Sequence, residues 1–305
     1  MNQIELELLY SDRVTREMIK DCLEESEVTQ AMHKKGVELL QAWIAEPSKY
    51  SAKALRREHL ATLDLDKIVT AVFINVIING LTTYTNTVMS LVGHLNLEKR
   101  AGVMLAAEVV AVLADVDLYD LTKDGDTIMV KNRLGIPKEI KEQAERSTYL
   151  PPLIDHPMKL THNNSTPYLS FEHESLILGG KHNHHDGDIC LDVLNIQNNI
   201  PIILNTTFIS ALHETVPNFK GKNDRVLTNK EKADAYKAWE KAQIQTKEFH
   251  KLLGSIPMYF GNKVDKRGRI YSSGYHLSPQ GTSYKKASLD LYEKETIDVP
   301  LEYQI

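Results

Sequence analysis

Two arginines that flank a glycine, Arg267 and Arg269, are the side chains of this sequence best suited to bind phosphate. Each guanidinium offers a rigid planar fork of N–H donors that matches phosphate oxygens. Side chains alternate in direction along a strand, so an extended segment predicts Asp265, Arg267, Arg269 and Tyr271 on one face. Gly268 has no Cβ atom, so a sugar-phosphate chain can approach the backbone closely. We interpret this face as a phosphate-binding surface on which Asp265 orients the arginines.

The residues that follow favour this interpretation over an exposed strand with a surface ion pair. Residues 278–281, Ser-Pro-Gln-Gly, predict a turn because Pro and Gly occupy positions that suit their backbone preferences. An amphipathic helix is expected to begin at Thr282 and to carry Lys285 and Lys286. Strand, turn and basic helix together predict one nucleic-acid-binding unit.

The order of these motifs, Asp-x-Arg-Gly-Arg-Ile-Tyr, a spacer, Pro-Gln-Gly and a helix lysine, resembles the first palm segment of the single-polypeptide RNA polymerases of phages and mitochondria, the T-seven-like class. The resemblance implies that Arg267, Arg269 and Tyr271 hold the template strand and the RNA–DNA hybrid beside the active centre. It also implies that Lys286 is the family's helix lysine. The sequence departs from the family in an extra residue before the turn and in Ser278, where asparagine is usual.

The same resemblance implies a catalytic partner. Members of the family continue through metal-binding palm aspartates and the fingers, and no such motif follows here before Ile305. Of a shortened chain and a natural split, we favour the split: the amino-terminal subunit of a heterodimeric bacteriophage DNA-directed RNA polymerase. The chain is then expected to have no catalytic residue or metal ligand of its own, with Mg²⁺ bound mainly by the second subunit.

The partners expected on this interpretation are the second subunit, the DNA template, the RNA–DNA hybrid and NTPs. A palm divided at this point predicts a large apolar interface with the second subunit. An accessory protein that opens DNA or binds single strands is a further candidate partner. The alternative hypothesis is a noncatalytic relative that grips nucleic acid, or inhibits a polymerase, through the same basic surface.

Charge is distributed unevenly along the chain. The formal net charge is −5 over 305 residues. Residues 1–150 contain 18 basic and 23 acidic side chains, whereas residues 219–286 contain 15 basic and 6 acidic ones. The carboxyl-terminal part is therefore expected to contact phosphates, with binding that weakens steeply as salt is added.

The composition also indicates a compartment. The two cysteines, Cys22 and Cys190, lie far apart, which argues against a disulfide framework and for reducing surroundings. The amino terminus lacks the basic start and apolar block of a signal peptide, and the most apolar run, residues 68–78, is too short to span a bilayer. We expect no membrane association and a location in the cytoplasm of the bacterial host.

The apolar periodicity predicts a mainly α fold with small β elements (α+β). Residues 1–150 are predicted to form a helical amino-terminal domain, with two helices over 14–46, a short one over 51–60, two more meeting near Gly80 within 65–95, and another over 98–113. A helix is also expected over 137–147.

Near residues 116–131 two short alternating runs predict a β-hairpin, because Asp-Gly supplies the positive φ angles of a tight turn. One interpretation is a hairpin that merely covers the core. The family resemblance implies another, a hairpin at the upstream edge of melted DNA, with Lys123, Asp124 and Gly125 at its tip.

The remaining chain is predicted to contain a connector and two polymerase parts. Residues 151–194 are rich in proline and predict an irregular connector. The Asn-Ile-Gln-Asn run at 195–198 resembles the family's entry into the thumb, so residues 195–255 are expected to form a reduced two-helix thumb, with helices over 202–212 and 229–253. Residues 256–305 are then the first palm segment.

A histidine-rich run over residues 181–190, Lys-His-Asn-His-His-Asp-Gly-Asp-Ile-Cys, contains zinc-compatible side chains. Its spacing matches neither paired structural ligands nor a His-Glu-x-x-His helix. His162 and His173 are further candidate ligands, but the sequence does not bring them together. An exposed polar turn is the favoured interpretation, and a zinc-dependent enzyme built around residues 182–190 is a third hypothesis.

Overall fold

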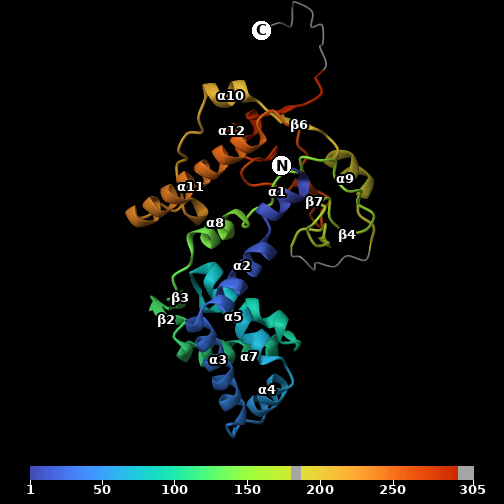
Figure 1. Ribbon diagram of the computed structural model, residues 1–305. Coiled ribbons are helices and arrows are strands. Elements are labelled where there is room, and N and C mark those ends of the chain that lie inside the picture. The colour runs from blue at the N-terminus through green and yellow to red at the C-terminus, as the bar shows by residue number, and fades with distance from the viewer. Residues whose placement is uncertain (180–186, 295–305) are drawn as a thin grey trace, which may run out of the picture. The chain divides into compact units, whose positions relative to one another are not determined.

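The computed structural model describes residues 1–179 and 187–294, which divide into two compact units (Figure 1). One unit is Ser11–Thr148, and the other joins Met1–Tyr10 to the residues from Tyr149 onward. Helical residues outnumber strand residues in the described part of each unit and the sheets are small, so the predicted mainly α fold with small β elements is confirmed. Residues 1–10, predicted as part of the helical domain 1–150, group instead with the later residues.

The unit Ser11–Thr148 is a helical bundle with one three-stranded antiparallel sheet in the order β1-β3-β2. The buried faces of α5 and α7 supply much of its core, including Val69, Phe73, Leu105 and Val109. Its elements are α2 (Asp12–Glu25), α3 (Glu27–Ala45), α4 (Ser51–Ala61), α5 (Leu65–Asn79), β1 (Leu81–Thr83), α6 (Tyr84–Leu91), η1 (Val92–His94), α7 (Lys99–Leu113), η2 (Ala114–Val116), β2 (Tyr119–Asp124), β3 (Thr127–Asn132) and α8 (Lys138–Arg146).

Local sequence signals explain where several of these elements begin and end. The Asp64 side chain accepts a hydrogen bond from the Lys67 amide, which caps the start of α5. Gly80 closes α5 at a φ of 64°, where glycine is favoured, so the predicted break near this residue is confirmed. The predicted hairpin is confirmed as β2 and β3, with Gly125 at a φ of 58° in its turn.

The two ends of this unit meet. Thr15 on α2 donates a hydrogen bond of 3.1 Å from its hydroxyl to the Ser147 hydroxyl, directly after α8. Helices α2 and α8 also pack against each other. The unit therefore begins and finishes at neighbouring points in space.

Gly36 on α3 sits where three apolar side chains converge. A Cβ atom there would lie 3.1 Å from Val69 Cγ1 and 3.3 Å from Leu113 Cδ2. We expect Gly36→Leu to lower the free energy of unfolding by about 1 to 3 kcal/mol, because the added atoms overpack a filled core. Chemical denaturation measures this. Ala42→Leu, at an exposed position of the same helix, is the matched control and is expected to stay within about 0.5 kcal/mol of the parent. Equal effects of both changes would contradict the packing argument.

The described residues of the second unit form one long helix, several short ones and three two-stranded antiparallel sheets, β4-β5, β6-β9 and β7-β8. One core cluster joins Leu6 of the first helix to Phe249, Leu253 and Met258. The elements are α1 (Gln3–Leu9), β4 (Asn164–Ser165), β5 (Glu174–Ser175), α9 (Leu191–Asn198), β6 (Ile202–Leu204), α10 (Thr206–Ala211), η3 (Lys222–Asp224), α11 (Asn229–Leu253), β7 (Asn262–Val264), β8 (Ile270–Ser272), α12 (Ser283–Ala287) and β9 (Leu289–Leu291).

One predicted helix of this unit is wrong and another is confirmed. Residues 202–212 form the strand β6 and the short helix α10 instead of one helix, because β6 pairs with β9, which lies far away in sequence. Helix α11 spans Asn229–Leu253 as predicted, and Thr228 and Glu231 form a capping box at its start. Only Thr246, Phe249 and Leu253 of α11 are buried, so its first turns project from the unit.

Helix α1 is held in the second unit by two buried polar side chains (Figure 1, where the blue α1 lies among yellow and red elements). The Gln3 side-chain oxygen accepts a 2.7 Å hydrogen bond from the Ile154 amide. Glu7, which is 0% exposed, accepts from the amides of Leu169 at 2.9 Å and Ser170 at 2.6 Å. Buried polar groups require such partners. These hydrogen bonds therefore hold α1 in the position in which Leu6 packs into the core.

No helix within the described part of the chain combines the length and the apolar character that crossing a bilayer requires.

Candidate nucleic-acid interface

The arginine motif forms a tight turn between two strands, and the single extended strand predicted from its alternation is wrong. Strands β7 and β8 pair as a hairpin, and residues 265–269 connect them. The Asp265 amide donates to the Arg269 carbonyl at 2.9 Å, and the Gly268 amide donates to the Asp265 carbonyl at 3.0 Å. Gly268 has a φ of 79°, which an L side chain rarely adopts. The turn itself therefore requires Gly268. From the sequence, the glycine was instead predicted to let a phosphate chain approach the backbone closely.

The Asp265 carboxylate organises the turn from inside. Its Oδ1 atom accepts hydrogen bonds from the amides of Arg267 at 2.9 Å and Arg269 at 3.1 Å. Such side-chain-to-backbone bonds are the reason that aspartate favours turns. With 15% of its side chain exposed, Asp265 is the most enclosed of the charged groups in this network.

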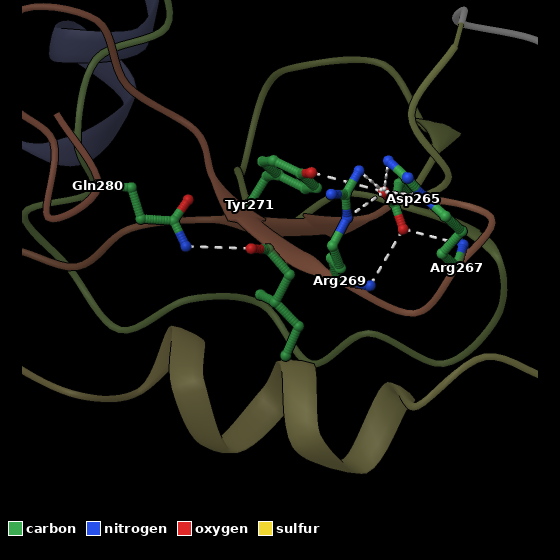
Figure 2. A network of polar contacts seen from close by, with 6 residues as sticks. Asp265, Arg267, Arg269, Tyr271 and Gln280 are labelled. Atoms are coloured by element: carbon green, nitrogen blue, oxygen red, sulfur yellow. Dashed lines mark hydrogen bonds and ion pairs between the residues drawn. The ribbon is translucent and has the colours of Figure 1, made fainter.

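The other carboxylate oxygen contacts the remaining three candidate side chains (Figure 2). Asp265 Oδ2 lies 2.6 Å from Arg269 Nη2 and 3.3 Å from Arg267 Nη2, and accepts a 3.4 Å hydrogen bond from the Tyr271 hydroxyl. The Arg269 guanidinium also lies 5.7 Å from the centre of the Tyr271 ring. The structure thus brings together all four polar side chains that the sequence predicted on one surface, although through a turn.

Both arginines remain open to solvent on their outer sides. The Arg267 side chain is 71% exposed and that of Arg269 is 54% exposed. Including exposed Lys266, the turn carries three positive side chains and one negative one. A surplus of cations with guanidinium forks held in place suits the binding of a phosphate group.

Arg269 lowers the pKa of Asp265. Partial desolvation opposes the charged form, but hydrogen bonds from the Arg269 amide and guanidinium outweigh it and lower the pKa of the Asp265 carboxyl. The carboxylate therefore stays charged at neutral pH and holds both guanidinium groups.

Gln280, in the Pro-Gln-Gly turn, ties that turn to the hairpin (Figure 2). Its side-chain oxygen accepts from the Ser272 amide at 3.0 Å, and its nitrogen donates to the Ile270 carbonyl at 3.0 Å. The side chain thus pairs with β8 as an additional strand would. From the sequence, Gln280 was predicted only as part of a turn, and no local pattern identifies its pairing with β8.

The two lysines of α12 differ in their surroundings. Lys286 is exposed, whereas Lys285 is half-buried and donates a hydrogen bond to the Tyr275 carbonyl. The Lys285 ammonium also lies 4.6 Å from the centre of the Tyr275 ring, and burial lowers its pKa. Lys285 therefore has a packing role that the sequence prediction did not include, and Lys286 is the lysine open to a ligand.

Two asparagines of the Asn-Ile-Gln-Asn run are positioning residues that sequence analysis did not identify. Asn195 pairs with Leu160, accepting from its amide at 2.8 Å and donating to its carbonyl at 3.0 Å. Buried Asn198 accepts from the Asn262 amide and side chain, both at 2.9 Å. Asn262 begins β7, so α9 is fixed to the strand that leads into Asp265.

Of two other predicted features, the hairpin tip can be located. Lys123, Asp124 and Gly125 are exposed at the turn of the β2–β3 hairpin, in the unit Ser11–Thr148. Most of the histidine-rich run, residues 181–186, lies outside the described residues. Within residues 1–179 and 187–294, no group of three or more His, Cys, Asp or Glu side chains is placed to hold a metal ion.

Comparison of the sequence with protein-family models and with curated proteins finds no match.

Proposed function

We propose that this chain is the amino-terminal subunit of a two-polypeptide DNA-directed RNA polymerase of the kind that its arginine motif resembles. The observation that carries the proposal is the pair of outward-facing guanidinium groups that Asp265 holds in one turn. Gln280 joins this turn to the Pro-Gln-Gly segment, so the motifs that suggested the family are also physically connected.

In this proposal the arginine turn grips the phosphates of the template and of the RNA–DNA hybrid. Guanidinium forks that are already oriented lose little conformational freedom when they bind phosphate. Helix α11 supplies further phosphate contacts in this proposal, because Lys230, Lys237 and Lys247 are exposed along it. We assign α10 and α11 to the thumb, and the segment from β7 to α12 to the first part of the palm.

The chemistry of nucleotide addition belongs to the second polypeptide in this proposal. That subunit supplies the palm aspartates that bind Mg²⁺, and the ions position and activate the reacting groups. The present chain holds the nucleic acid in register with that centre. We further propose that the β2–β3 hairpin, with Lys123 at its exposed tip, lies at the upstream edge of melted DNA.

Reconstitution tests the proposal directly. The chain alone, with a primed template, Mg²⁺ and NTPs, is expected to extend no RNA. Addition of a co-purifying polypeptide that carries the palm aspartates and fingers is expected to produce template-dependent RNA synthesis. Nucleic-acid binding without any such partner or synthesis would instead support the noncatalytic alternative.

Replacement of one arginine tests the site. We expect Arg269→Ala to weaken binding of an RNA–DNA hybrid by about tenfold, and to lower the slope of log K against log salt by about 1, because one phosphate contact is lost. Fluorescence anisotropy over a salt series measures both values. In the reconstituted enzyme the same variant is expected to slow elongation.

Lys266→Ala is the matched control, since it removes one positive charge from the same turn but leaves the Asp265 network in place. Its effect on hybrid binding is expected to be smaller than that of Arg269→Ala. If the Arg269→Ala enzyme elongates RNA at the normal rate, the assignment of the arginine turn to the nucleic-acid-binding site is wrong.

A further inference from the structure

Two histidines, His162 and His173, lie side by side near the β4–β5 sheet. The ring centres of His162 and His173 are 5.8 Å apart, and the ring planes are inclined by 39°. Both side chains are exposed. Eleven positions of sequence separate them, and it is the pairing of β4 with β5 that brings their segments together.

The distance between the rings suits a shared metal ion. An ion about 2.1 Å from one nitrogen of each imidazole holds the two ring centres roughly 5 to 6 Å apart. Neutral imidazole is a favoured ligand of Zn²⁺, Ni²⁺ and Cu²⁺. Because both rings face solvent, water can complete the coordination sphere without further protein ligands.

The backbone on both sides of the pair is fixed, which limits the cost of ordering the ligands. Buried Ser165 accepts a 3.2 Å hydrogen bond from the His162 amide and donates one of 2.6 Å to the His162 carbonyl. Ser165 is also the β4 residue that pairs with Glu174, directly after His173. Glu174 in turn forms an ion pair with Lys263 on β7.

We propose that His162 and His173 form a two-histidine site for a divalent transition metal, with Zn²⁺ as the first candidate. The bound ion cross-links the two segments that β4 and β5 join. This site is independent of the proposed polymerase function, because it requires neither nucleic acid nor a second polypeptide.

Calorimetric titration of the full chain with Zn²⁺, and separately with Ni²⁺, tests the proposal, using protein that carries no histidine tag. We expect one metal ion bound per chain at this site, and a rise in the midpoint of thermal unfolding, because the ion binds the folded state. His162→Ala and His173→Ala are each expected to weaken this binding by at least about tenfold, since each removes one of two protein ligands.

His213→Ala is the matched control, because His213 is an exposed histidine of the same unit outside the pair. It is expected to leave binding and the thermal shift unchanged. Absence of metal binding to the parent chain would overturn the proposal. So would binding that survives in the His162→Ala, His173→Ala double variant and disappears only when His182, His184 and His185 are replaced.

Discussion

Glu7→Ala is expected to lower the free energy of unfolding of the second unit by about 3 kcal/mol, because it leaves several buried donors without a partner. The carboxylate accepts hydrogen bonds from the Leu169 amide at 2.9 Å, the Ser170 amide and hydroxyl at 2.6 Å each, and the Gln3 side chain at 2.7 Å. The alanine side chain can accept none of these hydrogen bonds. Glu7→Gln keeps one acceptor oxygen and is expected to cost less.

Hydrogen exchange followed by mass spectrometry measures this effect, because it reports each unit separately. Protection should fall in the peptides of α1, residues 150–179 and α11, and remain unchanged in residues 11–148. Glu5→Ala is the matched control on the same helix. Glu5 is exposed, caps the helix start through the Asn2 amide and lies 3.8 Å from the Met1 amino group, so its loss should cost at most about 1 kcal/mol. A Glu7 variant as protected as the Glu5 variant would contradict the burial argument.

Acid is expected to destabilise the second unit through His276. This side chain is 5% exposed and is enclosed by the rings of Phe249, Tyr149 and Tyr275 at centre distances of 5.3, 5.2 and 5.0 Å. Burial, together with the nearby positive charge of Lys285, lowers the pKa of His276 to about 4. In the unfolded chain an ordinary histidine has a pKa of about 6.5.

The sign of the effect follows from these two pKa values. Above about pH 6.5 the imidazole is neutral in both states, and its contribution to stability is fully present. As the pH falls towards 4, the unfolded chain binds a proton that folded His276 does not accept. The unit is therefore expected to lose about 3 kcal/mol across this window.

Denaturant unfolding at a series of pH values tests this prediction. His276→Phe keeps a ring in the cluster and removes the titrating group, so the stability profile between pH 4 and 6.5 should flatten. His250, whose pKa burial also lowers, accounts for part of any remaining slope. His213→Ala removes an exposed histidine instead and should leave the profile as in the parent. An unchanged slope in His276→Phe would show that the ring does not titrate as argued.

Local sequence patterns were sufficient to predict those elements that are determined by residues close together in the chain. The limits of α11 follow from its apolar spacing and from Thr228 and Glu231 at its start, which form a local cap. The β2–β3 hairpin follows from Asp-Gly at its turn. In both cases the residues that determine the structure are neighbours in sequence.

The candidate site shows why periodicity alone is not sufficient. Alternating side chains at 265, 267, 269 and 271 fit an extended strand, but Asp265 and Gly268 also fit a turn. The turn is formed because Asp265 accepts two amide hydrogen bonds and Gly268 adopts a positive φ. The proximity of these four side chains was predicted correctly, since turn and strand both place them near one another.

Local sequence patterns could not predict the contacts between distant segments. Strand β6 exists because β9 lies beside it, and no local pattern of residues 202–204 identifies that partner. The Gln280 pairing with β8 and the Asn198 contact with Asn262 depend on the same kind of distant contact. Nothing near Glu7 in sequence indicates that its partners are Leu169 and Ser170.

The placement of α1 has a consequence for synthesis on the ribosome. The chain passes between the units twice, at Tyr10–Ser11 and at Thr148–Tyr149, so the whole of Ser11–Thr148 is inserted within the other unit. Helix α1 emerges before the inserted unit, yet its hydrogen-bonding partners at Ile154, Leu169 and Ser170 are translated long afterwards. The inserted unit can fold during this delay, because its own ends meet at Thr15 and Ser147. Helix α1 therefore cannot complete these hydrogen bonds until the residues that follow the inserted unit have been translated.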